Sequence, residues 1–208
     1  MSPRTAAKLL AQGLANVAVS PLLLLHVLKI PLLGPDRALE GSTQLLALFP
    51  GLIGQYLRRA FLGWTISHCH PSASIGFGTI FSKSASWIGE NVYIGPFCSL
   101  GYVHIARDTL IATGVHIPSG ARIHGTDDLT RPIREQQGEI VCVTVGRNCW
   151  IGNGAIIMAD IGSDSIIGAG AVVTNPIPPL SVAVGVPAKV LRSRATPVEQ
   201  SDFETPSP

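Results

Sequence analysis

The sequence predicts an all-β solenoid: a parallel β-helix of hexapeptide repeats, preceded by a helical N-terminal segment. The first observation is that an aliphatic or aromatic residue returns every six positions between residues 75 and 173, instead of about every two or 3.6 as in an ordinary strand or helix. The second is a small or slender side chain four positions after most of these apolar residues. A six-residue period of this kind is a sequence signature of β-helices.

The apolar positions fall into five runs that are separated by four changes of register. They are Ile75 and Phe81; Ile88, Ile94 and Leu100; Ile105, Ile111, Ile117 and Ile123; Val145, Ile151 and Ile157; and Ile161, Ile167 and Val173. The small positions are Thr79, Ala85, Val92, Cys98, Thr109, Val115, Ala121, Cys149, Ala155, Ser165 and Ala171. We expect the apolar side chains to fill the interior and the small ones to relieve crowding beside them.

Six residues suffice for a short strand and a turn, so three repeats make one triangular coil. Stacked coils would pair their strands at a spacing of about 4.8 Å. Glycine commonly follows the apolar residue, as in Ile75-Gly76 and Ile151-Gly152. We expect glycine at these corners either because φ is positive there or because another backbone approaches closely.

Composition limits the classes of function. The chain has 208 residues, 13% of them charged, and a formal net charge of +2. This length favours one main domain with room for an appendage, and the charged fraction is about half that of an average soluble domain. No cluster of lysine and arginine is interleaved with aromatic residues, so the sequence predicts no nucleic-acid partner.

The four cysteines do not form a recognisable metal or redox motif. Cys69, Cys98, Cys142 and Cys149 include no Cys-x-x-Cys pair, and zinc ribbons and thioredoxin-like sites depend on such pairs. Cys98 and Cys149 also occupy small inward positions of the repeat. We therefore expect buried, reduced thiols in a cytoplasmic protein.

Residues 1–63 do not share the six-residue period and form a separate helical segment in our prediction. Pro21, Pro31, Pro35 and Pro50 interrupt its apolar blocks, which predicts several short helices and no membrane-spanning run of about 18 apolar residues. A secretory signal is disfavoured, because Pro21 divides the apolar stretch and no clean small-residue cleavage site follows it.

Two interpretations of this N-terminal segment remain. In the first, which we favour, it is a helical cap over the open end of the solenoid, because a terminal coil needs covering. In the second it lies on a membrane surface as an amphipathic element, with Lys29, Arg37, Arg58 and Arg59 toward the lipid head groups. The second interpretation places a cytoplasmic protein in peripheral contact with a membrane.

The β-helix domain is expected to cover residues 64–194, with a protruding loop at about residues 124–144 where the repeat stops. Long loops on a rigid scaffold are commonly functional. The polar, proline-containing tail at residues 195–208 is predicted to be disordered.

Several motifs in the C-terminal half occur in a defined order. They are Trp150-Ile151-Gly152, Ile167-Gly168-Ala169-Gly170-Ala171-Val172-Val173-Thr174, Ile177-Pro178-Pro179 and Gly185-Val186-Pro187-Ala188-Lys189-Val190-Leu191-Arg192. This order resembles the C-terminal half of hexapeptide-repeat acetyltransferases, most closely the sugar and polysaccharide O-acetyltransferases of the galactoside, maltose and colanic acid type. The resemblance covers about residues 75–192, and its Gly-x-Pro-Ala-Lys ending is specific.

The resemblance implies a left-handed parallel β-helix and a homotrimer that binds acetyl-CoA in clefts between subunits, with no metal required. It implies acetyl-CoA-dependent O-acetylation of a sugar or a cell-surface polysaccharide precursor. By motif position, Asn153, Ala169 and Thr174 would contact the pantetheine arm of acetyl-CoA. Lys189 and Arg192 would meet its phosphates, whose negative charge cations suit.

Acetyl transfer to a hydroxyl needs a general base, and neutral imidazole can take the proton near pH 7. His124 lies where a coil gives way to the long loop, as the catalytic histidine of the family does, and it is our candidate for the base. His116 is its rival and a candidate for positioning the substrate. Further candidate acceptor contacts, chosen by location alone, are Tyr102, His104, Asp127, Asp128, Arg131 and Glu135.

Other functions remain open at this point. Many relatives carry an asparagine upstream of the histidine where this chain has Phe97-Cys98-Ser99-Leu100, which argues against a galactoside acceptor. Serine O-acetylation and amino-sugar N-acetylation fit the same motifs. A non-catalytic scaffold would need neither the histidine nor the cofactor motifs, and a zinc carbonic anhydrase of this fold uses three histidines at a spacing that His104, His116 and His124 lack.

Overall fold

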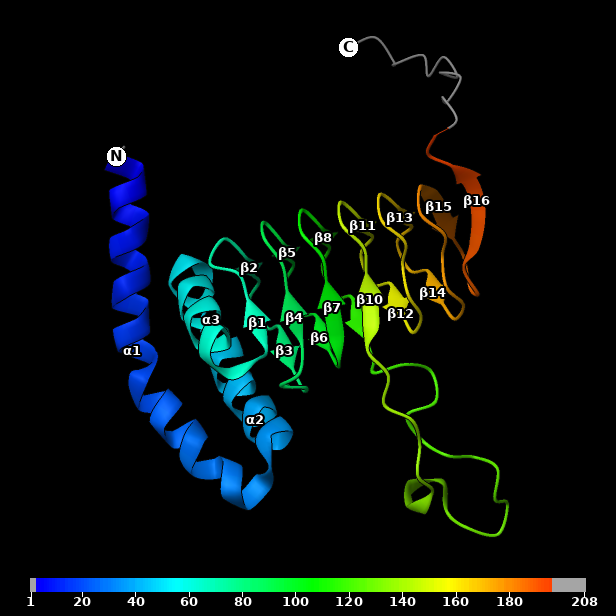
Figure 1. The fold of residues 1–208 in the computed structure, drawn as a ribbon, viewed down its shortest axis with the longest axis horizontal. Helices are drawn as coiled ribbons and strands as arrows, with labels where there is room; N and C mark the ends of the chain where they lie inside the picture. The colour runs from blue at the N-terminus through cyan, green and yellow to red at the C-terminus, as the bar shows by residue number, and fades with distance from the viewer. Residues whose placement is uncertain (1–2, 196–208) are drawn as a thin grey trace, which may run out of the picture.

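The structure is a computed structural model that describes residues 3–195. The chain forms three helices and then winds into a parallel β-helix, with one long loop leaving it (Figure 1). The predicted disordered tail, apart from Ala195, lies outside the described residues.

Three sheets form the walls of the solenoid. Sheet A contains β1 (His68–Cys69), β4 (Trp87–Ile88), β7 (Val103–Ile105) and β10 (Val143–Val145). Sheet B contains β2 (Ser74–Ile75), β5 (Tyr93–Ile94), β8 (Leu110–Ile111), β11 (Trp150–Ile151), β13 (Ile166–Ile167), β15 (Ser181–Val184) and β16 (Lys189–Ser193). Sheet C contains β3 (Ile80–Phe81), β6 (Ser99–Leu100), β9 (His116–Ile117), β12 (Ile156–Ile157) and β14 (Val172–Val173).

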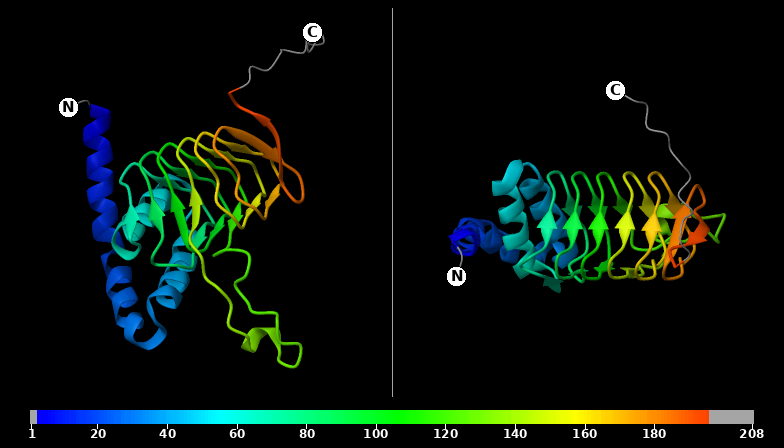
Figure 2. Two further views of the ribbon diagram at one scale, coloured as in Figure 1. Left: turned by 45° about the vertical axis from the view of Figure 1, so that its right-hand side comes forward. Right: turned by 90° about the horizontal axis from the view of Figure 1, so that it is seen from above.

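Each coil contributes to the three sheets in turn, and strands of successive coils pair in parallel. Ile94, for example, pairs with Ile75 of the preceding coil and with Ile111 of the following one. Among the strands of residues 3–195, only β16 runs antiparallel, against β15. The coils are stacked side by side along one axis (Figure 2), so the predicted parallel β-solenoid with a helical N-terminal segment is confirmed.

The predicted inward residues form the core, with three exceptions. Every predicted apolar position is buried except Ile123, which is 41% exposed. The regular coil ends at Ile117, one repeat earlier than predicted, and the chain then leaves the solenoid. For the same reason the small residue Ala121 is exposed, and Ala85 is exposed because Ser86 occupies the buried position in that turn.

The small buried positions also connect neighbouring coils through hydrogen bonds. Thr79 Oγ1 donates to the Gly95 carbonyl at 2.8 Å, and Thr109 Oγ1 donates to the Gly146 carbonyl at 2.8 Å. A slender side chain therefore fits beside the apolar residue and satisfies a corner carbonyl of the next coil. Because the hydroxyl has a partner, its burial carries little penalty.

Close backbone approach, and not positive φ, explains the glycine that follows the apolar residue. A Cβ on Gly76 would lie 2.4 Å from Gly95 C, and one on Gly152 would lie 2.5 Å from Ala169 N. Positive φ occurs two residues further on, as at Gly78 with a φ of 74°. The first residue of the corner therefore needs glycine because the next coil crosses directly over it.

The N-terminal segment forms α1 (Pro3–Leu33), α2 (Pro35–Ala47) and α3 (Gly51–Thr65). The prediction of several short helices with breaks at Pro21 and Pro31 is wrong, because both prolines lie within α1. A proline removes one backbone hydrogen bond, and α1 tolerates that loss while it packs against α2 and α3. Residues Lys8–Leu33 are consequently long and apolar enough to cross a membrane by length and composition alone, with a mean hydropathy of 1.7, contrary to our prediction.

The helices α2 and α3 cover the first coil of the solenoid, where α2 contacts β3 and α3 contacts β1 and β2. Arg58 of α3 is 3% exposed and donates hydrogen bonds to the carbonyls of Leu46 (3.1 Å), Phe49 (2.7 Å) and Ile75 (3.0 Å). Burial lowers the pKa of this guanidinium. The expectation that Arg58 faces lipid head groups is therefore wrong, since it links the end of α2 to the first coil.

Candidate active site

The long loop leaves the solenoid after β9 and returns at β10. Its two limbs lie antiparallel near the solenoid, where His124 and Gln137 form a β-bridge. The Glu139 N–H donates to the Arg122 carbonyl at 2.7 Å, and the Val141 N–H donates to the Ser119 carbonyl at 2.9 Å. These backbone bonds fix the base of the loop, and with it the position of His124.

A glycine in the returning limb permits the close contact with His124. A Cβ on Gly138 would lie 2.2 Å from Ile123 C and 2.4 Å from His124 N. Any larger residue would have to push the two limbs apart, since both clashing atoms are backbone. The absence of a side chain at Gly138 therefore allows the two limbs to approach closely, and this approach sets the position of His124.

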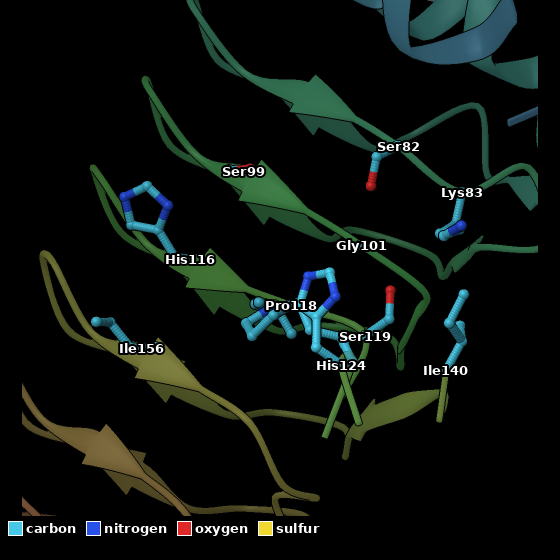
Figure 3. A pocket seen from close by; sticks show the side chains of 12 residues that line it. Ser82, Lys83, Ser99, Gly101, His116, Pro118, Ser119, His124, Ile140 and Ile156 are labelled. Atoms are coloured by element: carbon cyan, nitrogen blue, oxygen red, sulfur yellow. The ribbon is translucent and has the colours of Figure 1, made fainter. Parts of the chain in front are cut away.

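A cleft of about 430 Å³ lies between sheet C and the base of this loop. It is lined by Ser82, Lys83, Ser99, Gly101, His116, Ile117, Pro118, Ser119, Ile123, His124, Ile140 and Ile156. Figure 3 shows the imidazole of His116 on the strand side and that of His124 beside Ser119. The structure thus brings together the two histidines that the sequence offered as rivals.

A strand of the solenoid wall positions His116 in this cleft. It lies on β9, in register with Ser99 of the preceding coil and Ile156 of the following one, and its side chain is exposed on the outer face of sheet C. Successive residues of a strand point to opposite faces, so the burial of Ile117 inside the solenoid directs His116 outward. His124, by contrast, is held by the loop.

Lys83 also lines this cleft, although it was not predicted from the sequence. Its ammonium lies 3.0 Å from Asp36 Oδ2, and Asp36 Oδ1 accepts hydrogen bonds from the N–H and hydroxyl of Ser84. Burial acts to raise the pKa of Asp36, but these hydrogen bonds and the Lys83 charge outweigh it and lower that pKa overall. The Lys83 ammonium, held by its ion pair with Asp36 of α2, therefore lies at one end of the cleft.

The serines of the cleft, Ser82, Ser99 and Ser119, were likewise not predicted. Ser99 lies on the outer face of a strand, directly opposite His116 in the neighbouring coil. That juxtaposition follows from the register between two coils. An alignment of successive repeats against one another is the signal that would have found it.

Five predicted acceptor contacts, Tyr102, Asp127, Asp128, Arg131 and Glu135, are not part of this cleft. Asp128 and Arg131 are engaged within the loop: Asp128 Oδ1 accepts from Thr130, and Arg131 Nη2 donates to the Glu135 carbonyl at 2.9 Å. Asp127 borders a separate hollow of about 450 Å³ on the loop, which it shares with His124. Tyr102 directly precedes β7, whereas the other four lie further along the same loop as His124, and nearness in sequence did not bring them to the cleft.

The residues predicted for the pantetheine arm lie at exposed corners on the two sides of sheet C. Asn153 and Ala169 occupy the turns from sheet B into sheet C, whereas Thr174 follows β14 at the opposite corner. The outer face of sheet C lies between these corners. Thr174 borders a hollow of about 510 Å³ beside Val141 and Glu139, so the structure does not place it in the cleft of His124.

Lys189 and Arg192 lie on β16, at the C-terminal end of the solenoid, and both side chains are exposed. The segment before them approaches sheet C, since the Ala188 N–H donates to the Val172 carbonyl at 2.8 Å. Arg192 Nη1 donates to the Ser193 carbonyl at 3.3 Å, and both cations are accessible to an anion at that end. Because the coils that contain β10 to β14 lie between β9 and β16, the two cations are far from the histidine cleft.

The candidate histidines do not assemble into a metal site. The ring of His104 lies on the outer face of sheet A, with its centroid 4.5 Å from that of Trp87, whereas His116 and His124 share the cleft. Among residues 3–195 no group of three or more histidine, cysteine, aspartate or glutamate side chains is arranged to hold a metal ion. All four cysteines are free, and burial raises the pKa of the Cys69 thiol to about 12.

No protein-family model matches the sequence. The chain is 30% identical over 163 residues to the galactoside O-acetyltransferase of Escherichia coli (strain K12), an alignment that covers 68% of this chain and 80% of that protein. Its fold is similar to that of a galactoside acetyltransferase solved in complex with coenzyme A, with a TM-score of 0.63, 23% identity and coverage of 86% of this chain and 90% of that one.

A maltose O-acetyltransferase from Clostridium difficile 630 has the same TM-score of 0.63, at 24% identity, and the match covers 76% of this chain and 86% of that one. The two structural matches establish the left-handed β-helix fold, and the sequence match carries the relationship further. This chain therefore belongs to the hexapeptide-repeat acetyltransferase family.

Proposed function

We propose that this protein is an acetyl-CoA-dependent O-acetyltransferase that acetylates a hydroxyl group of a sugar or of a cell-surface polysaccharide precursor, in the cytoplasm. The observation that carries this proposal is the cleft in which the strand-borne His116 and the loop-borne His124 both lie. Membership of the acetyltransferase family supports the reaction class and acetyl-CoA as the donor. The serines and Lys83 along the cleft supply hydrogen-bonding groups suited to a hydroxylated acceptor.

In the proposed reaction the acceptor oxygen attacks the thioester carbonyl directly. His124 accepts the hydroxyl proton as the new C–O bond forms, and the tetrahedral intermediate collapses when the C–S bond breaks. The coenzyme A thiolate then takes the proton back from the imidazolium, so that the products are an acetyl ester and the free thiol. Since no acyl-enzyme is formed, the cleft must hold donor and acceptor together.

The first test is a transfer assay. Purified protein would be incubated with radiolabelled acetyl-CoA and a panel of free sugars, amino sugars, serine and polysaccharide fragments. We expect a labelled ester with a hydroxylated saccharide. Label on an amine alone, or on serine alone, would assign the protein to a different branch of the same enzyme class, and no label on any acceptor would contradict the proposal.

Gly138 provides a test of how His124 is positioned. Replacing Gly138 with alanine should lower turnover by at least about tenfold, because a displacement of about 1 Å in a catalytic group can cost a hundredfold. The matched control is Gly63→Ala, since a Cβ at Gly63 meets no atom within 4 Å. Steady-state kinetics would measure both variants. Full activity in Gly138→Ala would show that the loop limbs do not set the position of the base.

Lys189 and Arg192 are proposed to hold the phosphates of acetyl-CoA. If they do, changing both to glutamine should weaken binding of the cofactor while leaving turnover at saturation nearly unchanged, because an anchor far from the reacting atoms contributes equally to ground and transition states. Isothermal titration with coenzyme A would measure the affinity. An Arg147→Gln variant, which lies on the same solenoid but outside the motif, is the control. Unchanged affinity in the double variant would remove both residues from the site.

We also propose that the protein is a homotrimer, as the family resemblance implies. The outer face of sheet B supports this proposal, because Tyr93, Leu110 and Trp150 are 41%, 49% and 54% exposed there and a neighbouring subunit would cover them. Light scattering coupled to gel filtration should report three chains per particle. A monomer that is fully active on a verified acceptor would contradict a cleft shared between subunits.

A further inference from the structure

One side of α1 is apolar, and among the described residues no other element covers it. Ten large aliphatic side chains of this helix are exposed: Leu9, Leu10, Leu14, Val17, Leu24, Leu25, Val27, Leu28, Leu32 and Leu33. At about 100° per residue, Leu10, Val17, Leu24 and Leu28 lie opposite the buried Ala15, Val19 and His26, and the others except the terminal Leu33 border them. A helix on a water-facing surface would carry polar residues there. We call this side the outer face of α1.

The outer face lies at the far edge of the molecule. α2 and α3 stand between α1 and the first coil (Figures 1 and 2). Since the buried side of α1 packs against these two helices, its outer face is directed away from the β-helix. The apolar surface continues onto α3, since a hollow of about 360 Å³ between the two helices is lined by Leu14 together with Leu52 and Ile53, which are 72% and 74% exposed. A continuous exposed apolar surface of this kind marks an interaction site.

The charges of α1 indicate what covers this surface. The helix contains Arg4, Lys8 and Lys29 and no aspartate or glutamate, and burial lowers the pKa of its single histidine, His26. Leucine-rich helices whose only charges are lysine or arginine bind at the boundary between anionic head groups and acyl chains.

We propose that α1 lies in the plane of an anionic lipid surface, with its outer face in the acyl-chain boundary and Lys8 and Lys29, on the other side of the helix, extending toward the phosphates. The length and hydropathy of residues Lys8–Leu33 would also permit a membrane span. Spanning, however, would separate α1 from its protein contacts, or draw α2 and α3 into the bilayer.

Those contacts include polar ones that lipid could not replace. Trp64 Nε1 donates to Asn16 Oδ1 at 3.2 Å, and His26 Nδ1 lies 3.4 Å from Ser42 Oγ. Polar groups without partners are costly in hydrocarbon. The in-plane arrangement keeps both polar pairs intact on the protein side of the helix. It also removes the exposed leucines on the other side from water.

The experiment is co-sedimentation of the full chain with vesicles of phosphatidylcholine and phosphatidylglycerol, compared with vesicles of phosphatidylcholine alone. The wild-type protein should sediment with the anionic vesicles and less with the neutral ones. The combined variant Leu14→Gln, Val17→Gln, Leu24→Gln and Leu28→Gln should reduce the partition coefficient by about a hundredfold. The matched control, Leu129→Gln with Ile133→Gln on the exposed loop, should bind as the wild type does.

The lysines are tested separately. Changing Lys8 and Lys29 to glutamine should weaken binding to the anionic vesicles by about fivefold per lysine and leave binding to neutral vesicles unchanged. An alkaline carbonate wash should release the wild-type protein, because a helix in the interface is not held across the bilayer. None of these measurements needs an acceptor, so they are independent of the proposed reaction.

Three outcomes would overturn the proposal. The first is a wild-type protein that binds neither kind of vesicle. The second is retention on the vesicles after the carbonate wash, which would show a spanning helix. The third is an unchanged vesicle affinity in the leucine variant together with a smaller particle in light scattering, which would show that the outer face of α1 is covered by another copy of the chain.

Discussion

Replacing His124 with alanine is expected to lower the turnover rate by about 10² to 10⁴, the usual contribution of a general base, while the affinity for acetyl-CoA stays nearly intact. The reason is geometric: the imidazole borders the cleft, and backbone bonds between the two loop limbs hold it there. Backbone N–H groups that stabilise the oxyanion would survive the substitution, so residual activity should remain.

Two further histidine variants make this prediction specific. His116→Ala should be much milder, because His116 is proposed to position the acceptor, and its effect should fall mainly on KM. His104→Ala, on the outer face of sheet A and outside the cleft, should have little effect. If the His124→Ala enzyme keeps most of its turnover on a verified acceptor, His124 is not the base, and His116 becomes the candidate.

Replacing Ile111 or Ile151 with alanine is expected to lower the free energy of unfolding by about 2 to 5 kcal/mol. Both side chains are 0% exposed, and they pair with each other across adjacent coils of sheet B. Each truncation removes buried methyl groups and leaves a cavity, since the stacked backbone above and below cannot collapse into it. Urea denaturation monitored by circular dichroism would measure the loss.

Leu129 on the long loop is the control for this prediction. It is 97% exposed and lies outside the solenoid, so Leu129→Ala should cost less than about 1 kcal/mol. Equal losses at both positions would contradict the inward placement of Ile111. An unchanged midpoint in Ile151→Ala would contradict it for the following coil.

The six-residue period was enough to predict the interior of the solenoid. A residue such as Ile94 is buried because each wall contributes one inward residue per coil, and that requirement repeats along the chain. The corner glycines were predicted for two possible reasons, and only the structure separates them. At Gly76 the next coil crosses close above, a contact between residues that no local pattern contains.

The errors fall where the chain stops repeating. Ile123 continues the period but is partly exposed, because the loop departs after Ile117 and pairs its own limbs. Pro21 marked a helix end in the sequence, and α1 continues through it since packing against two other helices offsets one lost hydrogen bond. In both cases contacts with distant residues outweigh a local preference.

The sequence by itself determined the β-helix, its inward residues and the family motifs of the C-terminal half, because each depends on a short pattern that recurs or is characteristic in one stretch. Only the tertiary structure decided that His116 and His124 border one cleft, that Lys83 from the first coil reaches it, and that Arg58 is buried while the leucines of α1 are exposed. The physical reason is that these positions follow from the stacking of coils and the docking of helices, which join residues far apart in the chain.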